Sequence, residues 1–174
     1  MTTKINIRKF ITTSGILSLA GMLVAYSVAF ASTTATVAAT VTVQNISVSV
    51  SDGSVAYGTL GQNTTQDTCT GQLNDLQTVT NNGNVNEDFA IKGQDSSNWT
   101  LAATAGSDQY VQKFKNGACA TFSDGTALTT SNQSLATGIA SSETASLNLQ
   151  INTPNPSTVF TQQSVDVTIT ATAS

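Results

Sequence analysis

Cys69 and Cys119 are the residues of this sequence whose covalent chemistry is easiest to foresee. The spacing is far from C-x-x-C and the sequence contains no histidine, so a redox pair or a metal pair has no support. In an oxidising compartment two such thiols join to each other. The sequence therefore predicts a structural disulfide between Cys69 and Cys119.

Catalytic chemistry is hard to build from the remaining side chains. Without histidine, the Ser-His, Cys-His and His-metal sites of most hydrolases cannot form. A two-carboxylate glycosidase would need a residue such as Glu87 or Asp88, but both follow a predicted turn, where exposed acidic side chains are common. Loop carboxylates such as Asp52, Asp67 and Asp124 suit calcium, yet no D-x-D-x-D run is present. We therefore predict no enzyme and no cofactor, and we assign no metal site.

Trp99, the single tryptophan, has two interpretations. Its ring could stack on a sugar, as rings do in carbohydrate-binding modules, or it could fill the core of a small domain, which we favour because large rings dominate core burial. Trp99 is therefore a candidate ligand-binding or core residue. The other aromatic residues at alternating strand positions are predicted to lie in the core: Tyr57, Phe89, Tyr110, Phe114, Phe122 and Phe160.

The first 31 residues have the pattern of a secretory signal peptide. Lys4, Arg8 and Lys9 precede an apolar run from Ile11 to Ala29, and small residues stand at the positions that signal peptidase requires, which predicts cleavage after Ala31. An uncleaved membrane anchor is the alternative, because the run is long enough to span a bilayer. We expect a secreted protein at the cell surface with no stable membrane span in its mature form.

Removal of the signal peptide would leave an unusual charge balance. Three lysines would face ten acidic residues, a net charge of −7, with no arginine and no histidine. Binding to nucleic acid or to anionic lipid requires a basic surface, so neither partner is expected. Charged residues make up 9% of the chain, against roughly 25% in ordinary soluble domains. Uncharged polar side chains must therefore provide the solubility of the surface, as they do in many extracellular β proteins.

Apolar residues that alternate with polar ones predict strands throughout the mature chain. The first set, Val41 and Val43, is out of phase with the second, Ile46, Val48 and Val50, which indicates a bulge or a change of sheet. Four dipeptides predict tight hairpin turns: Asp52-Gly53, Asn82-Gly83, Asn116-Gly117 and Asp124-Gly125. Further strands are expected at Val55–Leu60, Leu76–Asn81, Val85–Lys92, Asn98–Ala103, Gln109–Lys115, Ala118–Phe122, Ala145–Ile151 and Val165–Thr172. This spacing predicts an all-β, immunoglobulin-like antiparallel β-sandwich.

The mature chain is predicted to consist of a short N-terminal segment, residues 32–44, and one sandwich domain, residues 45–174. The segment is β-branched and places Val37, Val41 and Val43 on one face of a strand. It could form the first strand of its own sandwich, which we favour, or leave the domain and complete the sheet of a neighbouring copy.

Two stretches resemble known surface proteins. Leu76–Asn84 (LQTVTNNGN) resembles the strand-turn-strand signature of secreted immunoglobulin-like domains, including the TasA and camelysin fibre group. Asn98–Leu101 (NWTL), followed by a β-rich C-terminal part, resembles the WxL domain that attaches to cell walls, although that family usually carries two such triplets and this chain has one. The resemblances imply a β-sandwich at the cell surface.

The sequence thus favours a non-enzymatic structural protein of the cell surface, a filament or surface-layer subunit whose partner is a second copy of itself. The alternative is a β-sandwich module that binds a cell-wall polymer or a carbohydrate.

Overall fold

The computed structural model describes residues 33–174, so the predicted signal peptide, residues 1–31, lies outside the described residues. The chain divides into two units at residue 41, and the second unit, residues 42–174, contains every strand that the structure describes. No helix is present in residues 33–174, and none there could span a membrane. The strands are β1 (Val48–Ser51), β2 (Thr65–Asp67), β3 (Gln77–Asn81), β4 (Glu87–Gly93), β5 (Thr100–Leu101), β6 (Gln109–Asn116), β7 (Thr126–Ala127), β8 (Gln133–Ile139), β9 (Thr144–Asn152) and β10 (Val167–Ala173).

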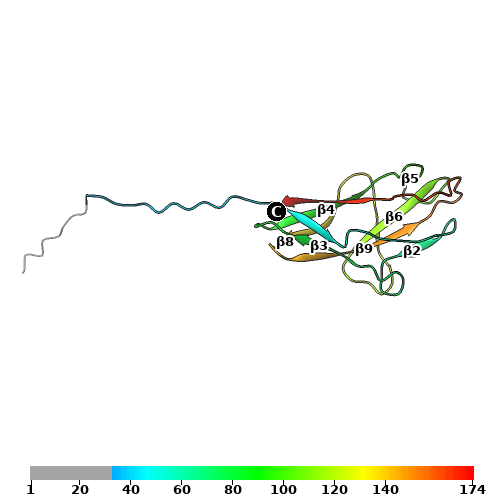
Figure 1. Ribbon diagram of the computed structural model, residues 1–174, viewed down its shortest axis with the longest axis horizontal. Coiled ribbons are helices and arrows are strands. Elements are labelled where there is room, and N and C mark those ends of the chain that lie inside the picture. The colour runs from blue at the N-terminus through cyan, green and yellow to red at the C-terminus, as the bar shows by residue number, and fades with distance from the viewer. Residues whose placement is uncertain (1–32) are drawn as a thin grey trace, which may run out of the picture. The chain divides into compact units, whose positions relative to one another are not determined.

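The strands form two sheets of unequal size. The larger sheet has seven strands in the order β1-β3-β9-β6-β5, with β2 paired to β9 and β7 paired to β6. The smaller sheet has three strands in the order β10-β4-β8. Figure 1 shows the two sheets running side by side along the domain. The predicted all-β sandwich is confirmed, and its pairings are antiparallel except for the short β5–β6 pair, which is parallel.

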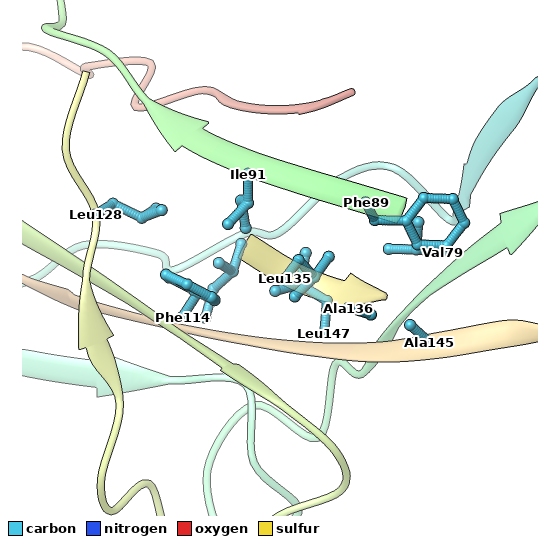
Figure 2. Close-up of a cluster of buried hydrophobic side chains, with 10 residues drawn as sticks. Val79, Phe89, Ile91, Phe114, Leu128, Leu135, Ala136, Ala145 and Leu147 are labelled. Carbon is cyan, nitrogen blue, oxygen red and sulfur yellow. The ribbon is translucent and has the colours of Figure 1, made fainter. Parts of the chain in front are cut away.

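The core lies between the sheets because alternate side chains of each strand point inward. In β4, for example, every second residue is buried, which places Phe89 and Ile91 in the core. From the larger sheet, Phe114 of β6 and Leu147 of β9 pack in the same cluster, as Figure 2 shows. The predictions that Tyr110, Phe89 and Phe114 are core residues are confirmed. Tyr57 is partly buried and packs against the core from an irregular segment, and Phe122 is half buried in a loop outside the core cluster. For Phe160 the prediction is wrong: its side chain is 81% exposed, because it lies in a loop and not in a strand.

The four predicted hairpin turns are not hairpins. Asn82-Gly83 connects β3 to β4, which belong to different sheets. Asp52-Gly53 and Asn116-Gly117 lead from strands into irregular loops, and Asp124-Gly125 ends the loop before β7. Three of the four nevertheless contain a residue with positive φ: Gly53, Gly117 and Asp124. Positive φ at three of the four dipeptides fits a local change of chain direction, but the sequence did not reveal that the chain crosses between sheets at Asn82-Gly83.

The strand predictions failed at five places. Val55–Leu60 and Ala118–Phe122 are irregular, and the short strands β2 and β7 and the seven-residue strand β8 were missed. In β8 the neighbouring residues Leu135 and Ala136 are both buried, because the pairing of β8 with β4 is interrupted by register shifts. A bulge of this kind removes the period-two pattern from which strands are predicted.

The N-terminal segment has no strand. No secondary structure is assigned from residue 34 to residue 47, and the first strand of the domain begins at Val48. The favoured prediction, in which this segment is the first strand of its own sandwich, is therefore wrong for the chain on its own. Val37 and Val41 are each 91% exposed and Val43 is 81% exposed.

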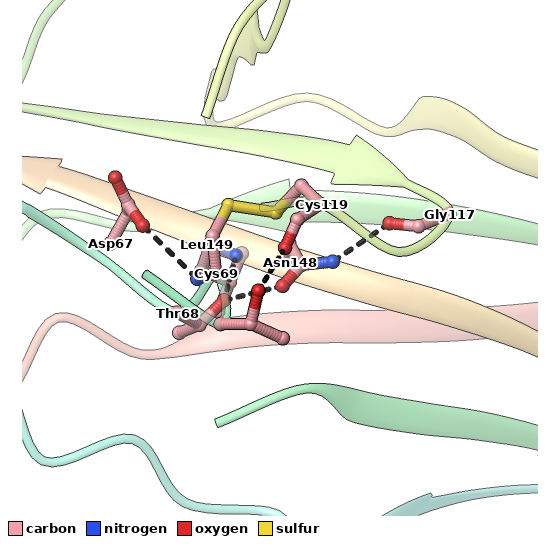
Figure 3. The surroundings of a disulfide bond; sticks show 8 residues. Asp67, Thr68, Cys69, Gly117, Cys119, Asn148 and Leu149 are labelled. Atoms are coloured by element: carbon pink, nitrogen blue, oxygen red, sulfur yellow. Dashed lines mark hydrogen bonds between the residues drawn. A yellow bond between two sulfur atoms is a disulfide. The ribbon is translucent and has the colours of Figure 1, made fainter. Parts of the chain in front are cut away.

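The predicted disulfide between Cys69 and Cys119 is present, and it joins two loops beside β9. Figure 3 shows the hydrogen bonds that surround it. The fully buried Thr68 hydroxyl donates to Asn148 Oδ1 at 3.0 Å, while the Asn148 amide donates to the carbonyl oxygen of Gly117 at 2.7 Å. The disulfide therefore reinforces a buried polar network that already links both loops to β9.

We expect the double variant Cys69→Ala/Cys119→Ala to lower the free energy of unfolding by about 4 kcal/mol, because the disulfide closes a loop of roughly 50 residues in the unfolded chain. Chemical denaturation followed by circular dichroism measures this change. Reduction of the wild-type protein should produce a similar loss and should not affect the variant. A loss below about 1 kcal/mol would show that the surrounding hydrogen bonds hold the loops without the cross-link.

Candidate binding groove

A long groove runs along one edge of the sandwich, and we call it the edge groove. One wall is formed by β1 and the loop of residues 53–62, and the other by the loop of residues 157–166 and the first half of β10. Its floor includes Leu147, Leu149 and Ile151 of β9. The volume is about 1230 Å³, which is large for a domain of this size. In Figure 1 the loops that form its walls lie at the end of the domain opposite the C-terminus.

The groove is apolar because core-facing side chains remain only half covered there. Nine partly buried apolar side chains pack against the core of the domain, and six of these nine line the groove. They are Val48, Val50, Val55, Tyr57, Val167 and Ile169. The exposed ring of Phe160 lies on the same groove. A binding partner that fits here would bury apolar surface that the chain alone leaves open to water.

Side-chain hydrogen bonds from β3 hold the first wall. The buried amide of Gln77 accepts from the backbone N–H of Gly53 at 2.9 Å and donates to the carbonyl oxygen of Ser54 at 3.1 Å. The same amide donates to Asp75 Oδ1 at 2.7 Å. One amide side chain thus fixes the path by which the chain leaves β1 and turns along the groove.

Asp108 holds the second wall. Its carboxylate accepts hydrogen bonds from the backbone N–H of Thr158 at 2.7 Å, the Thr158 hydroxyl at 2.6 Å and the Ser157 hydroxyl at 3.2 Å. Hydrogen bonds from the Thr158 hydroxyl and backbone, followed by that from Ser157, lower the pKa of Asp108 from its usual value of 3.8. Because this carboxyl is favoured in its charged form, the attachment of the loop depends on ionised Asp108.

Trp99 lines the groove and is only half buried. Its ring packs against the ring of Tyr110, with centroids 6.3 Å apart, and its indole N–H donates to the Ser157 hydroxyl at 3.2 Å. The structure therefore gives Trp99 features of both predicted roles: one side supports the wall of the groove, and part of the ring remains accessible to a ligand.

Two buried polar atoms in the groove lack hydrogen-bond partners. They are the hydroxyl oxygen of Tyr57 and Oε1 of Gln112. Burial raises the pKa of Tyr57 far above its usual value; the neighbouring Gln112 amide acts in the opposite direction but does not reverse the shift. The phenol therefore stays neutral.

The strand β10 borders the groove with a free edge. It pairs with β4 on one side and is the last strand of its sheet. Its inward-facing residues are Val167, Ile169 and Ala171, which pack against the core. An unpaired edge next to an apolar groove is the arrangement to which an additional strand binds.

The chain just before β1 is held at the opposite end of the domain. Asn84 donates from its backbone to the carbonyl oxygen of Asn45, and its side chain accepts from the Asn45 N–H at 2.8 Å and donates to the Val43 carbonyl oxygen at 2.8 Å. Residues 43–47, which we call the N-terminal anchor, are therefore fixed to the connection between β3 and β4.

Glu87 completes the anchor. Its carboxylate accepts from the backbone N–H of Ser47 at 2.9 Å and is fully buried, which corrects the prediction that Glu87 lies on an exposed surface. A side chain at Gly83 would collide with this carboxylate and with the carbonyl oxygen of Asn45, so the close approach requires glycine. Asp88 is half buried on the other side of β4, where its carboxylate accepts hydrogen bonds from the Ser174 hydroxyl and the backbone N–H of Gly138.

The structure does not gather the other candidate residues into a site. Within residues 33–174 no group of three or more cysteine and acidic side chains is close enough to hold a metal ion. Asp52 and Asp67 each accept hydrogen bonds from nearby backbone N–H groups instead. Neither the groove nor the anchor was predicted from the sequence; the alternating valines of the N-terminal segment were the only signal related to them.

Comparison with known proteins gave no match to a protein family, to a curated protein or to a solved structure.

Lowering the pH should release the loop of residues 157–166. The pKa of Asp108 is lower in the folded protein than in the unfolded chain, so its contribution to stability is complete above about pH 5 and is lost as the pH falls through the folded-state value. We expect Asp108→Asn to lower the melting temperature at pH 6 and to have a smaller effect at pH 2. The fluorescence of Trp99, the single tryptophan, reports on this loop through its contact with Ser157.

The control for this experiment is Asp124→Asn, which changes an exposed loop carboxylate that makes no hydrogen bond in the described part of the chain. If Asp108→Asn destabilised the protein equally at both pH values, the charged form of Asp108 would not be what holds the loop.

Proposed function

We propose that this protein is an exported structural protein that assembles with copies of itself at the cell surface, each copy contributing its N-terminal segment as a strand to another. The observation that carries the proposal is the exposure of an alternating apolar face in residues 33–43. Val37, Val41 and Val43 are half of the six large apolar side chains that stand out as exposed in the described chain.

The pattern of the segment suits a strand that is half buried in a partner. Every odd-numbered position from Ala35 to Val43 is alanine or valine, and most even-numbered positions are threonine. In a strand these two sets lie on opposite faces, one apolar and one polar but β-branched. Full burial of each valine would contribute about 1.5–3 kcal/mol to association. Backbone hydrogen bonds to an edge strand would add to this.

The domain offers a matching acceptor. The edge groove is apolar, open to solvent and bordered by the free edge of β10. Phe160, another of the six exposed apolar side chains, lies on it. Exposed apolar groups on both the segment and the groove support self-association rather than binding of a polar polymer.

Export is supported by the buried disulfide, since disulfides persist in oxidising compartments. The low content of charged residues, at 9%, agrees with an extracellular β protein. The signal-peptide pattern in residues 1–31 supplies the route to the cell surface.

A module that binds a wall polymer or carbohydrate is the second candidate, and the position of Trp99 favours it. The ring lines the groove, where sugars could stack on it. However, Tyr110 and Ser157 already contact the ring, which reduces the surface on which a sugar could stack. A soluble monomer whose retention by cell-wall polysaccharide is lost in Trp99→Ala would favour this candidate over self-assembly.

We expect the triple variant Val37→Thr/Val41→Thr/Val43→Thr to raise the concentration needed for assembly at least tenfold, because it makes the apolar face polar while keeping β-branched side chains. The melting temperature of the monomer should not change, since these side chains are exposed in it. Light scattering and negative-stain microscopy measure assembly, and calorimetry measures stability. The matched control is Thr36→Ser/Thr40→Ser/Thr42→Ser, which alters the opposite face. Equal assembly by both variants would contradict the proposal.

A further inference from the structure

We infer that the N-terminal segment of one copy enters the edge groove of the next copy antiparallel to β10, so that the copies join head to tail in an open chain. The inference rests on the proposed self-assembly and specifies its acceptor site, its strand direction and its polarity. The occupant of the groove is thus residues 33–43 of a second copy.

The two ends of the domain carry different parts of the contact. The N-terminal anchor lies where β1 begins and β10 ends, because Ser47 bonds to Glu87 and Glu87 pairs with Ala173. The groove opens at the other end, where the loops of residues 53–62 and 157–166 lie. A segment held at one end and an acceptor open at the other give a heterologous contact, which continues from copy to copy instead of closing into a dimer.

This separation determines the direction of the added strand. If the segment comes from a neighbouring copy at the mouth of the groove, its first residues penetrate deepest and Val43 stays near the mouth. β10 runs from the mouth at Val167 toward the anchor end at Ala173. The added strand therefore runs opposite to β10. A segment that folded back into the groove of its own copy would keep Val43 at the anchor end and would run parallel to β10.

The side chains also fit this direction. Opposite residues of an antiparallel pair point to the same face of the sheet. Odd-numbered residues of β10, such as Val167 and Ile169, face the core. The odd-numbered valines of the segment would then enter the groove, and its threonines would lie beside Thr168 and Thr172 on the outer face.

The lengths are compatible as well. β10 has seven residues, a length of roughly 23 Å, and the segment of about 11 residues extends to roughly 36 Å. The segment can therefore pair with the whole of β10 and still reach across the gap to its own anchor. The N-terminal anchor holds Val43 at the surface of its own copy, which limits how far the segment can reach into the groove of the next copy.

Disulfide trapping in assembled full-length protein tests the inference. Cysteine replaces Thr36 or Thr40 in one chain and Thr168, Thr170 or Thr172 in another, and the single variants are mixed before assembly. A cross-link between two chains then proves an intermolecular contact. In an antiparallel pair, the partner residue number falls as the residue number in the segment rises. We therefore expect the best partner of Thr36→Cys to lie closer to the C-terminal end of β10 than the best partner of Thr40→Cys. The yield should exceed that of each single variant alone at least tenfold.

The outcomes separate the inference from the proposed function. If the best partner of Thr40→Cys lies later in β10 than that of Thr36→Cys, the strands are parallel and the antiparallel arrangement is wrong. If chains that carry one cysteine in the segment and one in β10 form only links within a chain, the segment occupies its own groove and the head-to-tail arrangement is wrong. If fibres form but no mixture cross-links, the segment does not occupy this groove, although self-assembly stands. If the wild-type protein forms no assembly at any concentration, both the inference and the proposed function fail. A Thr130→Cys variant, on the loop between β7 and β8, serves as the matched acceptor control outside the groove.

Discussion

The inequality of the two sheets is the constraint from which the rest of this structure follows. A three-stranded sheet cannot cover the inner face of a seven-stranded one, so apolar side chains beyond the edge of β10 have only loops to cover them. The loops of residues 53–62 and 157–166 cover them in part and leave the edge groove between them. The same inequality leaves β10 with a free edge, since no strand of the chain lies beyond it among the residues described. Apolar surface and unpaired backbone groups therefore occur together at one place.

Uncharged polar side chains hold the irregular parts of the domain. Asn81, which is completely buried, donates to the carbonyl oxygens of Val85 and Ile139 and accepts from the N–H of Gly83, so one amide fixes the crossings between the two sheets. Gln77 has the equivalent role at the groove wall. Amides can both donate and accept, so they satisfy buried backbone groups that a charged side chain would satisfy only at a higher desolvation cost. This explains how a chain with so few charged residues keeps long loops in place.

The anchor and the groove have complementary mechanical roles in the proposed assembly. The anchor fixes residues 43–47 to the β3–β4 connection and so sets the point at which a donated strand leaves its own copy. The hydrogen bonds of Gln77 and Asp108 fix the groove walls and keep the acceptor open. An acceptor that is already formed loses little conformational entropy when a strand enters. The rigid sandwich therefore leaves most of the entropic cost of assembly to the segment itself.

The sequence by itself determined the fold class, the disulfide and the long strands. Alternation identified β4, whose inward and outward faces differ at every step, and the two cysteines had no competing partner. It also marked Val37, Val41 and Val43 as one apolar face. It did not find β8, where a bulge buries Leu135 and Ala136 side by side, and it placed the buried Glu87 on the surface. Only the tertiary structure decided which strands belong to which sheet, where the edge groove lies and that the segment forms no strand in its own domain. These features depend on contacts between residues far apart in the chain, whereas a periodic pattern records only which face of a strand is apolar and not what will cover it.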